Sequence, residues 1–209
     1  MSTIIVPIGI KLEEINAVFG SKNNELFIKL TSSDVYNHYD EEYSFKRELE
    51  ELIFHFVEKN KRVIKPSKFF GLIKGDDGRG LNGEWFDYAF ALLVICHHLG
   101  HSFLPINKEI KIEDNWNQFQ TVLSSSMPSY NIKKILSSEA IFDTPFKKDD
   151  EVKTFLLNKA ELHQFKIVLD KITSDYFKNE LFGLFRDTVQ TCLDKEMDLI
   201  FFSIEKIDD

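Results

Sequence analysis

Apolar positions recur along the chain with two periods, one typical of strands and one typical of helices. The β-branched run at 3–10, TIIVPIGI, predicts a strand. Pro7 places that strand at a sheet edge, because proline lacks the N–H that a ladder needs. The apolar residues of 12–19 then repeat at helical spacing up to Gly20, which predicts the end of a first helix. A second short helix is expected over 24–30.

Two longer segments carry the strongest helical signals. Segment 44–60 has a continuous apolar stripe on one side, and Ser44 is placed to cap its first turn. Segment 85–100 is apolar nearly all round, which indicates a buried central helix rather than a surface one. Gly100 predicts its end, with the glycine in the left-handed cap conformation.

Two further helices and a strand are predicted in the C-terminal part of the chain. Segment 158–173 has apolar residues at helical spacing, and Asn158 with Glu161 predicts a capping box at its start. A last helix leads into DLIFFSI, 198–204, which has the composition of a strand. Strands at both ends with helices between them predict an α+β fold. We expect one mostly helical globular domain, 1–209, with a small sheet in which the N- and C-terminal strands pair.

Composition narrows the class of protein. A chain of 209 residues buries a sizeable core, and most of its 20 phenylalanines are expected there. The formal net charge of −8 disfavours binding to nucleic acid or to anionic lipid and favours a basic protein partner. The N-terminal segment lacks a basic flank and a cleavage site, and the longest apolar run is far shorter than a membrane span. With only two cysteines, a cytoplasmic protein without membrane contact is expected.

Three stretches of packing pattern resemble an uncharacterised bacterial domain family. They are LEEINAVFGSKNNELF (12–27), YAFALLVICHHLG (88–100) and LFRDTVQTCLDKEMDLIFF (184–202). The family is marked by a short N-terminal strand, a central helix ending in His-Leu-Gly, and a C-terminal helix followed by an apolar strand. The resemblance spans most of the chain and implies the same fold and a single domain. No activity and no catalytic residue is carried over from it.

The stretch ICHHLGHSF, 95–103, holds the densest group of possible metal ligands. His97 and His101 have the i,i+4 spacing of zinc hydrolases, but the residue after His97 is His98 rather than a catalytic glutamate. Gly100 lies between them, so His101 is expected to leave the helix. We therefore favour histidines that bond to free carbonyls at a helix end over a metal or catalytic site, and we assign no metal.

Two further positions are candidates for a ligand site. Asp87 lies near the start of the apolar central helix, where a carboxylate stabilises the positive helix end; the alternative is a buried aspartate facing a pocket. The loop GDDGRGLNG, 75–83, precedes that helix but lacks the ending of a P-loop, and its two aspartates repel phosphate. A surface turn is expected, with Arg79 as its candidate ligand-binding residue.

The segment YNHYDEEYSF, 36–45, combines tyrosines with acidic residues. Tyrosines are enriched in interfaces, and acidic neighbours steer a basic partner. The candidate partner-binding residues are Tyr36, Tyr39, Asp40, Glu41, Glu42 and Tyr43. The alternative is a solvated segment whose tyrosines pack on the domain.

Two functional hypotheses follow from these candidates. The first is a non-enzymatic interaction module, similar to an immunity or antitoxin protein, that binds a basic partner through this acidic, tyrosine-rich surface. The second is a small-molecule or metal-dependent enzyme with its site at the C-terminal end of the central helix. The lack of an assembled catalytic set favours the first, and no cofactor is assigned.

Overall fold

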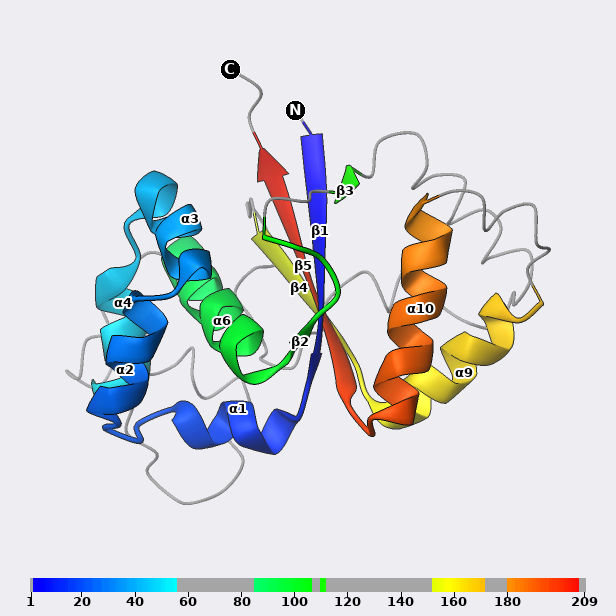
Figure 1. Ribbon diagram of the computed structural model, residues 1–209, viewed down its shortest axis with the longest axis horizontal. Helices are drawn as coiled ribbons and strands as arrows, with labels where there is room; N and C mark the ends of the chain where they lie inside the picture. The colour runs from blue at the N-terminus through cyan, green and yellow to red at the C-terminus, as the bar shows by residue number, and fades with distance from the viewer. Residues whose placement is uncertain (1, 56–84, 107–109, 112–151, 172–179, 207–209) are drawn as a thin grey trace. The chain divides into compact units, whose positions relative to one another are not determined.

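The computed structural model describes residues 2–55, 85–106, 110–111, 152–171 and 180–206 (Figure 1). The chain divides into two compact units. The first comprises 1–9, 102–138 and 153–209, and the second comprises 10–101 and 139–152. The expected loop at 75–83, with Arg79, and residues 56–60 of the helix expected over 44–60 lie outside the described residues.

The first unit is built on a sheet that contains both ends of the described chain. Its strands are β1 (Ser2–Ile10), β2 (His101–Ser102), β3 (Ile110–Lys111), β4 (Val152–Leu157) and β5 (Asp198–Lys206). The order is β2-β1-β5-β4, and β3 also pairs with β1. The N- and C-terminal strands β1 and β5 are therefore neighbours, as the sequence predicts. The α+β class, mostly helical with a small sheet, is confirmed.

The predicted edge position of β1 is wrong. β5 lies on one side of β1, and the short strands β2 and β3 lie on the other. Strand β3 pairs antiparallel with Ile4 and Ile5, which precede Pro7 in the strand. Among the described residues, β2 and β3 are two residues each and leave parts of this side of β1 unpaired, and a proline is tolerated in a strand whose pairing is interrupted.

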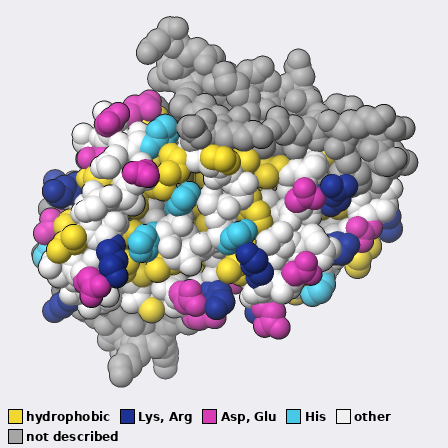
Figure 2. Space-filling model, in the orientation of Figure 1, with side chains coloured by type: hydrophobic (Ala, Val, Ile, Leu, Met, Phe, Trp, Pro, Cys, Tyr) yellow, Lys and Arg dark blue, Asp and Glu magenta, His cyan; other side chains and the backbone are white. Residues whose placement is uncertain are grey.

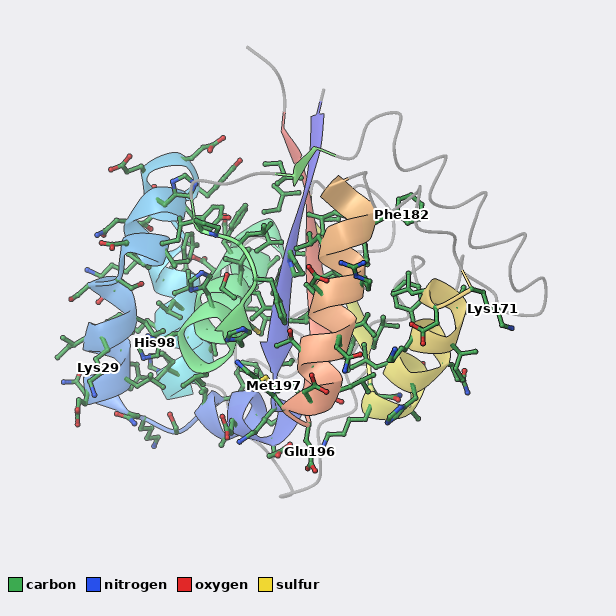
Figure 3. All side chains as sticks on the ribbon, turned by 45° about the vertical axis from the view of Figure 1, so that its right-hand side comes forward. Lys29, His98, Lys171, Phe182, Glu196 and Met197 are labelled. Atoms are coloured by element: carbon green, nitrogen blue, oxygen red, sulfur yellow. The ribbon has the colours of Figure 1, made fainter. Side chains whose placement is uncertain are left out.

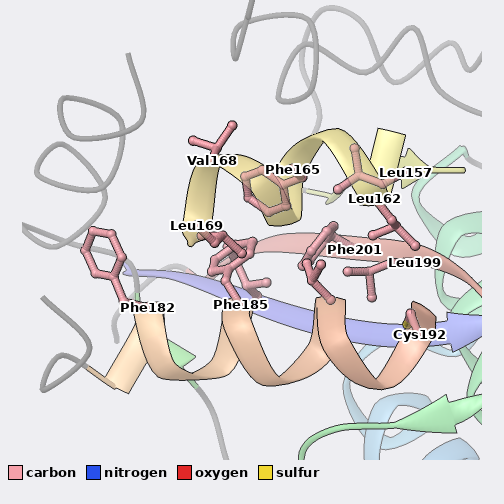
Figure 4. Packing of buried hydrophobic residues seen from close by; sticks show 12 residues of the cluster. Leu157, Leu162, Phe165, Val168, Leu169, Phe182, Phe185, Cys192, Leu199 and Phe201 are labelled. Atoms are coloured by element: carbon pink, nitrogen blue, oxygen red, sulfur yellow. The ribbon is translucent and has the colours of Figure 1, made fainter. Parts of the chain in front are cut away.

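Two helices cover one face of this sheet and form its core. They are α9 (Lys159–Leu169) and α10 (Glu180–Asp194), and both pack on β5 and on each other (Figure 4). Asn158 and Glu161 form the predicted capping box at the start of α9. The core side chains are Ile5, Leu157, Leu162, Phe165, Val168, Leu169, Phe182, Phe185, Val189, Cys192, Leu199 and Phe201.

At Gly9, strand β1 lies close to the C-terminal end of α10. A Cβ atom added there would lie 3.0 Å from Sγ of Cys192 and 3.1 Å from Sδ of Met197. The amide N–H of Met197 donates to the carbonyl of Cys192 at 2.8 Å, which ends α10 beside β1. The lack of space explains the glycine, because any side chain at this position would contact two sulfur atoms.

The second unit consists of helices packed around one apolar helix. They are α1 (Leu12–Val18), α2 (Asn24–Thr31), α3 (Asp34–Tyr43), α4 (Lys46–Glu50), the π-helix η1 (Glu51–His55) and α6 (Trp85–Leu99). Helix α6 contacts α1, α2, α3 and α4. Its residues from Tyr88 to Cys96 are all buried, which confirms the predicted central helix. The two predicted helices before residue 31 are confirmed as α1 and α2.

The turn between α1 and α2 donates backbone hydrogen bonds to two carbonyls of the π-helix. Gly20 has a positive φ of 65°, which glycine adopts without steric cost. The turn directs the amide N–H groups of Gly20 and Lys22 toward the carbonyls of Leu52 and Ile53, each at 2.9 Å. These long-range bonds hold the π-helical segment against the start of the chain's second unit.

Candidate functional site

The acidic, aromatic segment of the sequence is helix α3. Ser33 caps its start by accepting a hydrogen bond from the Tyr36 amide at 3.2 Å. Ser44 ends it in the left-handed conformation with φ 52°, and its amide donates to the Asp40 carbonyl at 3.1 Å. The predicted role of Ser44 as the cap of the next helix is therefore wrong. Helix α4 begins after Phe45 without a side-chain cap.

The tyrosines of α3 pack against the second unit rather than face outward. Tyr36 is 5% exposed, and its ring meets Phe45 edge-on with centroids 5.2 Å apart. Tyr43 stacks on Phe90 of α6 at 4.2 Å, and Tyr39 lies against the same ring at 5.3 Å. Both are half-buried. These tyrosines correspond to the packing alternative, and they fix α3 on the central helix.

The carboxylates of α3 form its outer surface. Asp34, Glu41 and Glu42 are exposed and Asp40 is half-buried, while the helix contains no lysine or arginine. We call these four residues the acidic surface of α3. In Figure 2, acidic side chains gather at the upper left, where α3 lies. The Tyr43 hydroxyl donates to Oε1 of Glu42 at 2.7 Å.

Three of these carboxylates occupy an unfavourable place on the helix. Asp40, Glu41 and Glu42 all lie in the last turn, where the helix macrodipole is negative. Each exposed charge placed there costs about 0.3–1 kcal/mol at low ionic strength. Arg47 of the following helix α4 forms its ion pair with Glu51 at 3.2 Å, rather than with these carboxylates. The arrangement gives the end of α3 a negative potential at a cost in stability.

Two oxygen atoms of neighbouring side chains on α3 are buried. They are the hydroxyl oxygen of Tyr36 and Oδ1 of Asp40, one helical turn apart. Burial, and then a hydrogen bond to the neighbouring Asp40 carboxylate and its negative charge, raise the pKa of the Tyr36 phenol. The phenol therefore stays protonated at neutral pH.

The histidines of the stretch ICHHLGHSF, 95–103, do not converge. His97 is half-buried in the last turn of α6, and His98 is exposed at the same helix end (Figure 3). Burial, and then the neighbouring His98, lower the pKa of His97. His101 has left the helix and belongs to β2, as predicted. The Gly100 amide donates to the Cys96 carbonyl at 2.8 Å, but Gly100 does not adopt the predicted positive φ.

Within the described ranges, no three His, Cys, Asp or Glu side chains are grouped so that they could hold a metal ion. Both cysteines are free and buried. Burial raises the pKa of both thiols, that of Cys192 to about 12 with a contribution from Asp198. These cysteines are packing residues, in agreement with the sequence-based interpretation.

Asp87 belongs to a group of carboxylates that sequence reasoning missed. It lies in the first turn of α6, near Glu48 and Glu51 of α4 and η1. Glu48 is 4% exposed, and burial, together with the charges of Asp87 and Glu51, raises its pKa. The Tyr88 hydroxyl donates to Oε2 of Glu51. We call Glu48, Glu51 and the half-buried Asp87 the carboxyl cluster of α4, η1 and α6.

A signal for Glu48 was present in the sequence. It lies three residues after Phe45 and four before Leu52, both on the apolar stripe of the helix predicted from residue 44, so helical geometry places it inside the stripe. A glutamate there is buried by its neighbours. Its burial favours the protonated form, which is a structural role in this packed interface between α4 and α6.

Comparison of the chain with family models, curated proteins and solved structures found no match. The resemblance to a bacterial domain family therefore stays a prediction. None of the helices in the described part of the chain is long and apolar enough to cross a membrane.

Proposed function

We propose that the protein is a non-enzymatic interaction module that binds a basic protein partner through the acidic surface of α3. The observation that carries the proposal is the position of Asp40, Glu41 and Glu42 in the last turn of α3. Carboxylates there destabilise the helix, and residues that break a local rule at a cost in stability are typical of functional sites.

Charge and rigidity both support binding of a cationic surface. The negative pole of the helix and its carboxylates add, so they attract and orient a basic partner. Tyr39 and Tyr43 hold α3 on Phe90, so the surface is ordered before a partner binds and little entropy is lost on binding. Immunity and antitoxin proteins are a class of interaction modules that fits an acidic protein with a basic partner.

Affinity capture from extract of the native cell tests this function with two matched variants. Glu41→Gln/Glu42→Gln removes two exposed carboxylates from the acidic surface of α3. Glu13→Gln/Glu14→Gln removes two exposed carboxylates from α1 of the same unit and leaves the net charge equal.

We expect the wild type and the α1 variant to retain the same basic protein, quantified by mass spectrometry, and the α3 variant to lose it. Equal retention by both variants would remove the role proposed for α3. Equal loss in both would show that net charge alone governs capture.

A further inference from the structure

The turn that joins α10 to β5 places a methionine against strand β1. Met197 lies in this turn, beside the C-terminal end of β1 (Figure 3). Its Sδ is 3.1 Å from the position of a Cβ atom added at Gly9, and Sγ of Cys192 is 3.0 Å from the same position. Contacts this short leave no room for an added atom between the sulfur and the strand.

The packing of Met197 belongs to a strained turn. Glu196, just before it, has a positive φ of 54°, which a residue with a side chain adopts only at a cost. The Met197 amide donates to the Cys192 carbonyl at 2.8 Å, and the Glu196 amide donates to the Leu193 carbonyl at 3.2 Å. This pair of bonds is a Schellman motif, in which an apolar contact, here between Met197 and Cys192, accompanies the backbone bonds. The ion pair of Glu196 with Lys159 is exposed and 3.9 Å long, so it adds little.

Met197 is also the sulfur-bearing side chain that reaches solvent. Of the three such side chains that the structure describes, Cys96 and Cys192 are buried and Met197 is half-buried. Burial raises the pKa of both thiols, so they stay protonated, whereas oxidation of a cysteine proceeds through its thiolate. A thioether has no proton to lose and keeps its reactivity toward peroxide.

We propose that Met197 is a site of reversible oxidation by peroxide, whose sulfoxide releases the end of α10 from β1. The O–O bond of hydrogen peroxide breaks, the thioether sulfur gives up two electrons and gains one oxygen, and the other oxygen leaves as water. A methionine sulfoxide reductase reverses the step with two thiols, which form a disulfide while the oxygen leaves as water.

The added oxygen makes the side chain polar at a contact that suits only an apolar one. At Gly9 the sulfoxide meets a strand too close to admit the oxygen and the Cys192 thiol, which is a weak hydrogen-bond donor. The oxidised side chain therefore leaves this contact, and the turn at Glu196 loses the packing that offsets its strain.

Peroxide treatment of the full chain tests the site. Peptide mass spectrometry locates the added oxygen, thermal unfolding measures its effect on stability, and hydrogen–deuterium exchange shows where the fold loosens. Met197→Leu removes the sulfur and nearly preserves the volume of the side chain. Met127→Leu is the matched control, since it removes a methionine from another part of the sequence.

Met197 should gain one oxygen before Cys96 or Cys192 is modified. The Tm of the wild type and of Met127→Leu should then fall by about 2–10 °C, as expected for a buried polar group without a good partner. Exchange over 192–200 should accelerate, while exchange over 34–43 stays unchanged. Met197→Leu should keep its Tm under peroxide, and a sulfoxide reductase with dithiothreitol should restore that of the wild type. Should Met197→Leu fail to fold, the test is whether the loss of Tm follows the oxidised fraction of Met197.

Three outcomes would overturn the proposal. The first is a Met197 without oxygen after a treatment that oxidises it in the urea-unfolded chain. The second is an oxidised Met197 with unchanged Tm and unchanged exchange over 192–200. The third is an equal loss of Tm in Met197→Leu and in the wild type. None of these outcomes bears on the proposed function, because α3 belongs to the second unit.

Discussion

Neutralising one carboxylate at each end of α3 should change stability in opposite directions. Asp34 is the first residue of the helix, and Glu41 lies in its last turn; both side chains are exposed. Asp34→Asn removes a negative charge from the positive pole of the helix dipole, and Glu41→Gln removes one from the negative pole. Both substitutions nearly preserve side-chain size and change the net charge equally.

The magnitude follows from the position of each charge. A surface charge at a helix end contributes about 0.3–1 kcal/mol at low ionic strength. Glu41→Gln should therefore raise the free energy of unfolding by about 0.3–1 kcal/mol, and Asp34→Asn should lower it by a similar amount. For a chain of about 200 residues, these changes correspond to shifts in Tm of about 1–4 °C. Glutamate and glutamine have nearly equal helix propensity, so propensity does not mask the effect.

Thermal unfolding followed by far-UV circular dichroism at low ionic strength measures both shifts. Repeating the melts in 1 M salt, where the Debye length falls to about 3 Å, should bring both variants toward the wild type. A rise in Tm for both variants would mean that relief of overall negative charge governs stability. The reasoning about the dipole, and with it the stability cost that supports the proposed function, would then be refuted.

Three further substitutions test the packing of each unit. Glu48→Gln should raise the Tm at neutral pH, with a gain that shrinks toward pH ~4.3. A raised folded-state pKa means that the wild type loses stability as pH rises through it, so parallel pH profiles for variant and wild type would contradict this. Gly9→Ala brings a methyl group against Cys192 and Met197 and should cost about 1–3 kcal/mol in urea denaturation; an unchanged midpoint would show that the sulfur atoms give way. Phe90→Ala removes the fully buried ring beneath α3 and should cost about 3–5 kcal/mol, with loss of near-UV tyrosine signal; a retained signal would argue against the stacking.

Most of the described fold follows from local patterns in the sequence. The capping box of Asn158 and Glu161, the pairing of the terminal strands and the buried helix 85–99 all form as predicted. The capping box and the helix depend on residues close in sequence, whereas the strand pairing follows from apolar strand patterns at both ends of the chain. The prediction of one domain over 1–209 stays a prediction, beside the two compact units of the structure.

The errors arise where long-range contacts decide the outcome. Pro7 suggests an edge, but two short strands pair with β1 on the side away from β5, and pairs of two residues leave little sequence signal. Ser44 fits a helix start by type, yet α3 extends to Tyr43 and needs a residue that adopts a positive φ. The π-helix from Glu51 depends on a distant turn that bonds to its carbonyls.

The candidate site was predicted in part. The acidic residues of α3 could be read from sequence, because charge and exposure go together. The inward direction of Tyr36, Tyr39 and Tyr43 depends on Phe90 and Phe45, which lie on other elements. The carboxyl cluster of α4, η1 and α6 joins Asp87 to residues nearly forty positions earlier, a separation that a single sequence does not reveal.

Hydrogen–deuterium exchange of the full chain, with and without the basic protein recovered by affinity capture, tests the central claim most directly. If the acidic surface of α3 binds the partner, amides over 34–43 should exchange more slowly in the complex, and Glu41→Gln/Glu42→Gln should abolish that protection. Protection confined to other described segments, with 34–43 exchanging as in the free protein, would contradict the claim.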